Sequence, residues 1–383
     1  MAKKRPQKHT FEALLYADSE TDTDVLYFGG AMVPDPFIAF SCKGRRIAVL
    51  SRLEYARVRK EGRYDEVLSL EAVEQEARKS ARREFLYPGS IIAWLARRYG
   101  IKGFRVSSTF PCGPALQLQQ LKVRLDVADG LLFPERERKT DEEARFIRQG
   151  NDAAAAGFRV VEKLLREAEI KRGYLYHSGK RLTSEILQRA ISIECLNRGA
   201  VASNTIVAGG DQACDPHCRG TGPLRANEFI IVDIFPRVSA TGYHGDMTRT
   251  YLKGTPSDLQ RDLYVAVFEE QQKALQAHRS GRSGSLIYQK VKAGFDERGF
   301  PSTTKNGTPV GFIHGLGHGL GLAVHEPPRV NAAGSRLRKG QVITVEPGLY
   351  YPGLGGVRVE DVIRVTSGEP ELLSKHGYRW HIR

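Results

Sequence analysis

The segment HGLGHGLGLAVHEPP, His314–Pro328, places three histidines and four alternating glycines within fifteen residues. A phosphate-binding glycine loop, a glycine-rich core strand and a metal site can each produce such a pattern. A dinucleotide loop requires G-x-G-x-x-G between a strand and a helix. Counted from Gly315, the sixth position is Leu320. Counted from Gly317, it is Leu322, and no Lys-Ser/Thr pair of a P-loop follows. The phosphate loop is therefore excluded.

Acidic residues elsewhere in the chain separate the two remaining possibilities. Three apolar runs contain carboxylates: Asp233 in FIIVDIF, Glu346 in VITVEPG, and Glu360 with Asp361 in VRVEDVIRV. Asp246 begins the expected strand DMTRTYLKG. An ionised carboxylate in an apolar strand is costly unless it is paired or coordinates a metal. One such residue could belong to a salt bridge or a turn. Several of them require a common explanation.

Four of these carboxylates and the imidazole of His318 suit a pair of divalent cations such as Mn²⁺, Co²⁺ or Zn²⁺. Two metals roughly 3.5–4 Å apart can share a water, lower its pKa and hold both oxygens of a tetrahedral intermediate. Taken alone, His318 could equally be an ordinary core histidine. Together with the four carboxylates it is better explained as a ligand.

The same residues carry a family resemblance. The proposed ligands occur in the order Asp233, Asp246, His318, Glu346 and Glu360. This order resembles that of the metal ligands in the pita-bread metallopeptidases, a family that includes methionine aminopeptidase, aminopeptidase P and prolidase. The motifs HGLGHGLGLAVHE, VEPGLY and GVRVED are most similar to the Xaa-Pro branch. The resemblance implies an α+β chain, with a C-terminal pita-bread (creatinase/aminopeptidase) fold and a smaller α/β N-terminal creatinase-like domain. We place the boundary in the charge run after Phe133, giving domains 1–137 (creatinase/prolidase-like) and 138–383 (catalytic).

The resemblance also implies a role for each ligand. Asp233 would bind one metal through both oxygens, and Asp246 and Glu360 would bridge the two metals. His318 and Glu346 would complete the other metal site. Glu346 would in addition move a proton from the bridging water, which makes it a catalytic residue. The alternating glycines, by their small size, are interpreted as permitting close approach of the backbone around the metals, with no direct chemical role.

Five further residues receive roles from the resemblance. His325 would steady the scissile carbonyl and its oxyanion. His217 matches a further catalytic histidine that lines the substrate cleft. His314 and Arg358 match the substrate-binding pair that distinguishes Xaa-Pro enzymes from methionine aminopeptidases, and Tyr350 would also line the cleft.

Strand alternation supports part of this assignment independently. Arg358 and Glu360 are two residues apart and should share one face of their strand, whereas Asp361 should point to the other face. Two features depart from the family pattern. The two aspartates of that pattern are eleven positions apart, but Asp233 and Asp246 are thirteen apart. The small residue expected two positions after the first aspartate is Phe235. A hairpin lengthened by two residues would explain the spacing.

The resemblance therefore predicts a dinuclear-metal hydrolase, an Xaa-Pro aminopeptidase or Xaa-Pro dipeptidase. It would contain two divalent ions, with Mn²⁺ favoured and Co²⁺ or Zn²⁺ as alternatives. Its substrate would be a peptide or dipeptide with proline at the second position, and the resemblance implies a homodimer. The alternative is a metal-free pita-bread scaffold that binds a protein or nucleic-acid partner. Retention of all five ligand types favours the enzyme.

Composition limits the remaining classes. With 41% apolar and 27% charged residues, the 383-residue chain is typical of a soluble globular protein. It shows neither a signal peptide nor a run of ~18 uncharged apolar residues, so we expect a cytoplasmic protein without a membrane partner. The net charge of +14 is spread along the chain without a nucleic-acid-binding signature, and no nucleic-acid partner is expected. The odd number of cysteines, five, indicates reduced thiols.

Periodicity and composition predict the elements. Helices are expected around 69–86, 90–100, 141–168, 183–199, 256–278 and 284–298. Strands are expected at 25–33, 37–51, 104–110, 204–210, 228–235, 246–254, 341–351 and 356–366. Gly100 is expected to end its helix, and Thr140 with Glu143 to form a capping box. The second half of the chain thus resembles two successive units, each a pair of helices with strands.

Overall fold

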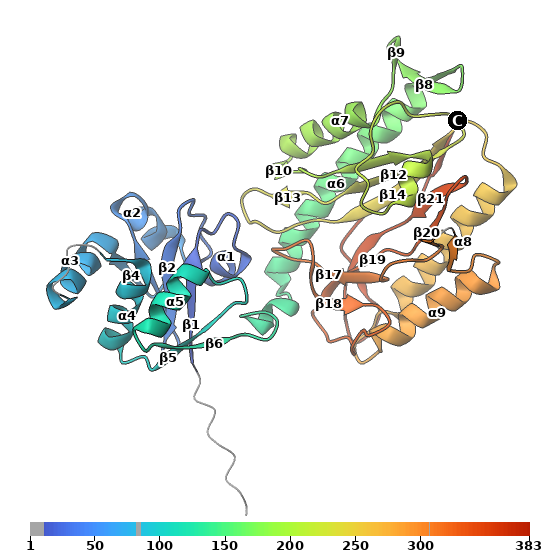
Figure 1. The fold of residues 1–383 in the computed structure, drawn as a ribbon. Helices are drawn as coiled ribbons and strands as arrows, with labels where there is room; N and C mark the ends of the chain where they lie inside the picture. Colours follow the sequence, from blue (N-terminus) through green and yellow to red (C-terminus); the bar gives the residue numbers. More distant parts are fainter. Residues whose placement is uncertain (1–10, 82–85, 306) are drawn as a thin grey trace, which may run out of the picture. The chain divides into compact units, whose positions relative to one another are not determined.

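The structure is a computed structural model that describes residues 11–81, 86–305 and 307–383. The chain divides into two compact units, Met1–Pro134 and Glu135–Arg383. Each unit combines helices with sheets (Figure 1). Among the described residues, no helix is both long enough and apolar enough to cross a membrane.

The N-terminal unit is built on one mixed sheet of six strands in the order β4-β3-β2-β1-β5-β6. The strands are β1 (Glu12–Ala17), β2 (Phe37–Cys42), β3 (Arg45–Leu50), β4 (Glu66–Ser69), β5 (Gly103–Val106) and β6 (Arg124–Val127). The helices are α1 (Thr23–Gly29), α2 (Arg52–Glu61), α3 (Leu70–Ala81), α4 (Pro88–Tyr99) and α5 (Cys112–Gln120). Leu14 packs with residues of α3 and α4 and Leu15 with residues of α1 and α2, so both faces of the sheet are covered.

Three predictions for this unit need correction. The strand expected at 37–51 is a hairpin of the two antiparallel strands β2 and β3. Residues 25–33 do not form a strand, because α1 occupies most of this segment. Asp22 caps α1 by accepting from the backbone N–H groups of Asp24 and Val25, and Gly30 ends it with φ +67. The strand expected at 104–110 ends at Val106. The predicted C-cap at Gly100 is confirmed, and the end of the helix expected at 69–86 lies outside the described residues.

The C-terminal unit contains the helices α6 (Asp141–Glu167), α7 (Ser184–Asn197), α8 (Asp258–Ala277) and α9 (Gly284–Glu297), as predicted to within a few residues. The Thr140–Glu143 capping box of α6 is confirmed. One sheet has the order β11-β12-β14-β24, formed by Ile206–Gly209, Phe229–Ile234, Met247–Lys253 and His381–Ile382. A second has the order β18-β17-β19-β22-β23, formed by Glu326–Val330, Gly317–Gly319, Val342–Val345, Asp361–Arg364 and Glu371–Leu372.

Smaller elements complete this unit. The hairpin of β20 (Gly348–Tyr351) and β21 (Gly355–Arg358) is the largest of them. The others are β7 (Glu169–Lys171), β8 (Tyr174–His177), β9 (Lys180–Arg181), β10 (Ala200–Val201), β13 (Arg237–Val238), β15 (Thr303–Lys305), β16 (Thr308–Val310) and the 3₁₀ turns η1 (Pro134–Glu137) and η2 (Gly210–Cys214). The segment between β12 and β14 contains β13, which pairs with β10.

Two helix pairs cover the sheets of the C-terminal unit, α6 with α7 on one side and α8 with α9 on the other (Figure 1). Ile230 and Val232 of β12 pack in the core of α6 and α7, and Ile343 and Val345 of β19 pack in the core of α8 and α9. Side chains alternate along a strand, so Asp233, which lies between the core residues Val232 and Ile234, faces away from the helices. This alternation collects the polar residues on the inner faces of the two sheets.

Helix α6 lies very close to the segment that enters β14. A Cβ atom built on Gly245 would lie 2.2 Å from the carbonyl carbon of Gly150, and one on Gly150 would lie 2.3 Å from the amide nitrogen of Gly245. Neither contact could be relieved by a flexible side chain, because both involve backbone atoms. Two glycines are therefore needed for α6 to reach this segment.

We expect Gly245→Ala to lower the free energy of unfolding by about 1–3 kcal/mol, because the added methyl group overpacks the contact with Gly150. Urea unfolding followed by circular dichroism measures the change. Gly368→Ala is the matched control, because a Cβ there would meet no atom within 4 Å; its effect should stay within about 0.5 kcal/mol. Equal effects of the two substitutions would contradict the interpretation.

Candidate functional site

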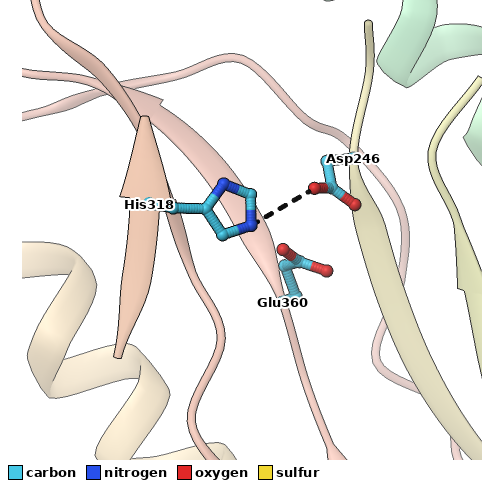
Figure 2. Close-up of side chains that lie close together, drawn as sticks. All are labelled: Asp246, His318 and Glu360. Carbon is cyan, nitrogen blue, oxygen red and sulfur yellow. Dashed lines mark ion pairs between the residues drawn. The ribbon is translucent and has the colours of Figure 1, made fainter. Parts of the chain in front are cut away.

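Three of the predicted ligands lie together in the structure: Asp246, His318 and Glu360 (Figure 2). Each offers one ligand atom, and these atoms all lie within 4.8 Å of one another. Asp246 directly precedes β14, His318 is the central residue of β17, and Glu360 lies between β21 and β22. All three are buried. No other cluster of this kind occurs in the part of the chain that the structure describes.

The ring of His318 has the form of a metal ligand. Its Nδ1 lies 3.1 Å from the carbonyl oxygen of Gly319, to which it can donate. Nε2 then holds the lone pair, and it lies 3.7 Å from Asp246 Oδ2 and 3.3 Å from Glu346 Oε1 (Figure 2 draws the first contact). Burial lowers the pKa of His318 to about 4, so the imidazole is neutral at pH 7. A neutral imidazole fixed by a carbonyl is typical of metal sites.

The carboxyl groups of Asp246 and Glu360 are held where ionisation is unfavourable. Burial is the main factor that raises the pKa of both groups. The neighbouring carboxylates of Asp233 and Glu346 raise both pKa values further. Glu360 Oε2 accepts a 2.7 Å hydrogen bond from Thr248 Oγ1, while the buried Oε1 has no hydrogen-bond partner. A nearby cation would stabilise the ionised form of both groups.

Asp233 and Glu346 lie at the edge of this cluster. Asp233 is opposite Thr248 in the pairing of β12 with β14, so their side chains share a face. Its Oδ2 accepts a 2.8 Å hydrogen bond from Arg358 Nη2, and its buried Oδ1 has no partner. Glu346 follows β19, and its Oε1 accepts from Thr344 Oγ1 at 3.2 Å.

The donor set fits divalent cations. Among the described residues, Arg358 is the only lysine or arginine that forms an ion pair with any of the four carboxylates. Three of the four carboxyl groups therefore lack a lysine or arginine partner, and two buried carboxyl oxygens lack a hydrogen-bond partner. Carboxylate oxygens and a neutral imidazole nitrogen are ligands of Mn²⁺, Co²⁺ and Zn²⁺. The local charge and the free oxygens both favour cation binding.

His325 and His217 occupy different environments. The ring of His325 packs edge-on against His318, with 4.4 Å between ring centroids. Partial burial is the main cause that lowers the pKa of His325 to about 4, and the nearby His318 and Arg329 lower this pKa further. His217 is exposed, and its ring makes no hydrogen bond within the described ranges. It adjoins Pro216, whose carbonyl oxygen accepts from Arg358 Nη1 at 3.5 Å. The structure thus brings His325, but not the His217 ring, into contact with a predicted ligand.

His314, Tyr350 and Arg358 form a chain of hydrogen bonds. Tyr350 is fully buried, and its hydroxyl oxygen accepts from Arg358 Nη1 at 3.0 Å. The same hydroxyl lies 2.8 Å from His314 Nε2, and His314 Nδ1 lies 2.7 Å from the carbonyl oxygen of Gly315. Both ring nitrogens of His314 therefore have protein partners. The predicted sharing of a strand face by Arg358 and Glu360 is confirmed, because Thr248 Oγ1 contacts both side chains.

A buried ion pair joins β14 and β22 on the side of these strands that faces away from Glu360. Arg249 Nη2 donates to Asp361 Oδ1 at 2.9 Å, and the guanidinium lies between the rings of Phe158 and Tyr378. Arg249 Nη1 donates to the carbonyl oxygen of Glu360 at 2.6 Å. The prediction that Asp361 points away from Glu360 is confirmed. This pair fixes the backbone that carries Glu360.

A second buried ion cluster supports His325. The next residue, Glu326, is 3% exposed and accepts from Arg136 Nη2 at 3.0 Å and from Lys139 Nζ. Burial lowers the pKa of Lys139, while the charge of Glu326 opposes this change. The cluster anchors the segment between β17 and β18.

The prediction that the alternating glycines permit close approach of the backbone is confirmed for Gly317 and Gly319. A Cβ on Gly317 would lie 2.0 Å from the carbonyl oxygen of Thr344, and one on Gly319 would lie 2.1 Å from that of Pro327. These glycines allow β17 to approach the backbones of its neighbours, β19 and β18. The clearance is between strands, and the contacts do not involve the ligand side chains.

Sequence reasoning missed two residues that hold ligands in place. Asn151 of α6 is fully buried; its Oδ1 accepts from the backbone N–H of Asp246 at 2.8 Å and its Nδ2 donates to Leu373 O at 3.1 Å. Thr248 donates to Glu360. The polar Asn151 within the alanine-rich part of a long helix was a signal that could have identified the first.

Comparison with known proteins identifies the family. The sequence profile of metallopeptidase family M24 matches residues 145–367. The chain belongs to this family. The match includes all five predicted ligands, and M24 metallopeptidases use divalent metals.

Among curated relatives, the Xaa-Pro dipeptidase of Pyrococcus furiosus is 34% identical over 176 residues, which cover 45% of this chain and 48% of that protein. The matched region thus spans about half the length of that relative. The Xaa-Pro dipeptidase of Pyrococcus horikoshii is 28% identical over 284 residues, 72% of this chain and 74% of that protein. The solved X-Pro aminopeptidase of Thermotoga maritima superposes with a TM-score of 0.79 over 97% of both chains at 20% identity. This likeness confirms the predicted pita-bread fold.

We expect Asn151→Ala to weaken Mn²⁺ binding by about 10–100-fold, because the backbone that positions Asp246 loses its partner. Isothermal titration calorimetry of the metal-free protein measures the affinity. Asp152→Ala is the matched control, since Asp152 is the exposed neighbour on the same helix. Equal Mn²⁺ affinities in the two variants, both folded by circular dichroism, would refute this role of Asn151.

Proposed function

We propose that this M24 member is a dinuclear-metal hydrolase that cleaves the bond between an N-terminal residue and proline, as an Xaa-Pro aminopeptidase or Xaa-Pro dipeptidase. The observation that carries the proposal is the cluster of four carboxylates that faces one guanidinium and one neutral imidazole. The relatives named Xaa-Pro dipeptidase support the proline preference. The structural likeness to an X-Pro aminopeptidase is the reason to include peptides longer than a dipeptide among the proposed substrates.

In this proposal two divalent ions are held by Asp233, Asp246, His318, Glu346 and Glu360. Mn²⁺ is the proposed ion, with Co²⁺ or Zn²⁺ as alternatives. When bound, such ions lower the pKa of a water nucleophile and polarise the scissile carbonyl. Asp246, Glu360 and His318 would hold an ion together, because one ligand atom of each lies within 4.8 Å of the others.

Glu346 is proposed as the proton carrier of the reaction. Its side chain is 17% exposed, the largest such fraction among the ligand residues that form ion pairs here. Thr344 Oγ1 fixes one of its oxygens by donating a 3.2 Å hydrogen bond to Oε1. The other oxygen can accept a proton from the attacking water and pass it to the leaving imino nitrogen of proline.

Four other residues are proposed to act on the substrate. His325 is neutral above its pKa of about 4, so it can donate a hydrogen bond to the oxyanion without adding a charge. His314, Tyr350 and Arg358 are proposed to shape the substrate side through their hydrogen-bond chain, and His217 to contact the substrate from the surface. The homodimer and the cytoplasmic location stay predictions.

We expect the metal-free protein to bind about two equivalents of Mn²⁺ and to release protons when it does so. The raised pKa values mean that Asp246 and Glu360 retain protons at a pH where ordinary carboxyl groups have lost them, and ligation must displace these protons. Affinity should therefore rise with pH. Titration calorimetry in two buffers of different ionisation enthalpy counts the released protons.

Glu360→Ala should reduce the Mn²⁺ content to one equivalent or less, whereas Glu369→Ala, at an exposed position, should leave it unchanged. A wild-type protein that binds less than one equivalent would contradict the metal site. It would favour the metal-free binding scaffold.

Peptide cleavage separates the finer alternatives. We expect Ala-Pro or Ala-Pro-Ala to be cleaved with a kcat/KM about tenfold or more above that of Ala-Ala and Ala-Ala-Ala. Cleavage of the dipeptide alone identifies a dipeptidase, and cleavage of the tripeptide identifies an aminopeptidase. Equal rates for proline and alanine peptides would leave a metallopeptidase without the proposed specificity.

A further inference from the structure

The N-terminal unit contains a hollow that the proposed reaction does not use. It encloses about 270 Å³. Apolar side chains form most of its wall, among them Val33, Ile38, Val49, Leu70 and Ile91. Most of these are almost completely buried, so the hollow reaches the core of the unit. Ligand sites are typically concave, largely apolar and lined by a few polar groups.

The position of the hollow in the sheet is one that α/β proteins commonly use for ligands. β1 and β3 both run antiparallel to β2, so they share one direction, and β4 is parallel to β3. Tyr16 near the end of β1, Leu50 at the end of β3 and Leu70 just after β4 all line the hollow. In open α/β sheets, ligands bind outside the carboxyl ends of the strands. The hollow lies at these ends.

The charged side chains that line the hollow among the described residues are all acidic. They are Asp35, Glu54 and Glu74. Glu54 and Glu74 each bind an arginine on their own helix, Arg57 and Arg78, through Oε2. Their side chains are 18% and 30% exposed, so their charges are partly shielded from water. Asp35 has no ion pair among the described residues.

These features define the chemistry of a ligand. An apolar wall accepts a compact hydrocarbon body, and carboxylates at the mouth complement a cation. The acidic side chains among the described lining residues repel carboxylates and phosphates, and thus disfavour free amino acids and nucleotides. We propose that this hollow binds a small organic ammonium ion, with its apolar body against Ile38, Val49 and Ile91 and its charge at Glu54, Glu74 and Asp35. This site is independent of the metal centre.

Titration calorimetry of the metal-loaded protein with three matched probes tests the proposal. The probes are phenethylamine, 2-phenylethanol and 3-phenylpropionate, which share an aromatic body and differ in charge. We expect phenethylamine to bind, the alcohol to bind at least about tenfold more weakly, and the anion not to bind. Equal binding of all three probes, or no binding of the amine, would overturn the proposal.

Variants locate the bound amine. Glu54→Gln combined with Glu74→Gln should weaken phenethylamine binding at least about tenfold, because both neutral amides lose the charge-assisted contact. Glu76→Gln is the matched control. Glu76 lies on α3, as Glu74 does, but it pairs with Arg98 and does not line the hollow. Melting temperatures verify that each variant is folded.

Glu360→Ala separates this site from the metal centre. We expect the affinity for phenethylamine to stay unchanged in this variant, whatever its effect on metal content or peptide cleavage. Loss of amine binding in Glu360→Ala, with binding retained in the Glu54/Glu74 double variant, would place the amine at the catalytic carboxylates and refute the proposal. If the protein cleaves no peptide but binds phenethylamine as expected, the proposed peptidase function is wrong and the proposed amine site still holds.

Discussion

The concentration of buried negative charge between the two sheets is the constraint on which the C-terminal unit depends. Asp233, Asp246, Glu346 and Glu360 come from four separate segments, and within the described chain only Asp233 is paired with a guanidinium. Carboxylates so close together in a region of low dielectric constant raise one another's pKa values, and burial raises them further. A cation resolves this conflict, so the arrangement is informative about chemistry as well as about folding.

Residues outside the cluster give this charged region its geometry. Asn151 holds the backbone of Asp246 from α6, and the Arg249–Asp361 pair holds the backbone of Glu360 from the opposite face. Breaking such a buried pair typically costs several kcal/mol, because one charge is left uncompensated. The helix pairs therefore do more than cover apolar strand faces. Their polar contacts fix the positions of side chains on the inner faces.

The two acidic regions of this basic protein differ in their physical character. In the C-terminal unit the carboxylates are buried and surrounded by polar partners, which suits small divalent ions with oxygen and nitrogen ligands. At the hollow of the N-terminal unit the carboxylates lie at the mouth of an apolar wall, which suits an organic cation. Charge sign alone does not distinguish these sites. The polarity of the surrounding surface does.

The sequence by itself determined the helices of the C-terminal unit and the opposite orientations of Glu360 and Asp361, because these depend on period and local capping. It failed at α1, where apolar β-prone residues fold as a helix between the cap at Asp22 and Gly30. Only the tertiary structure decided which charges meet: Arg358 with Asp233, Arg249 with Asp361, and Asn151 with Asp246. These partners are separated by roughly a hundred residues. A local stretch of sequence does not determine which distant strands lie next to each other, so it could not predict these contacts.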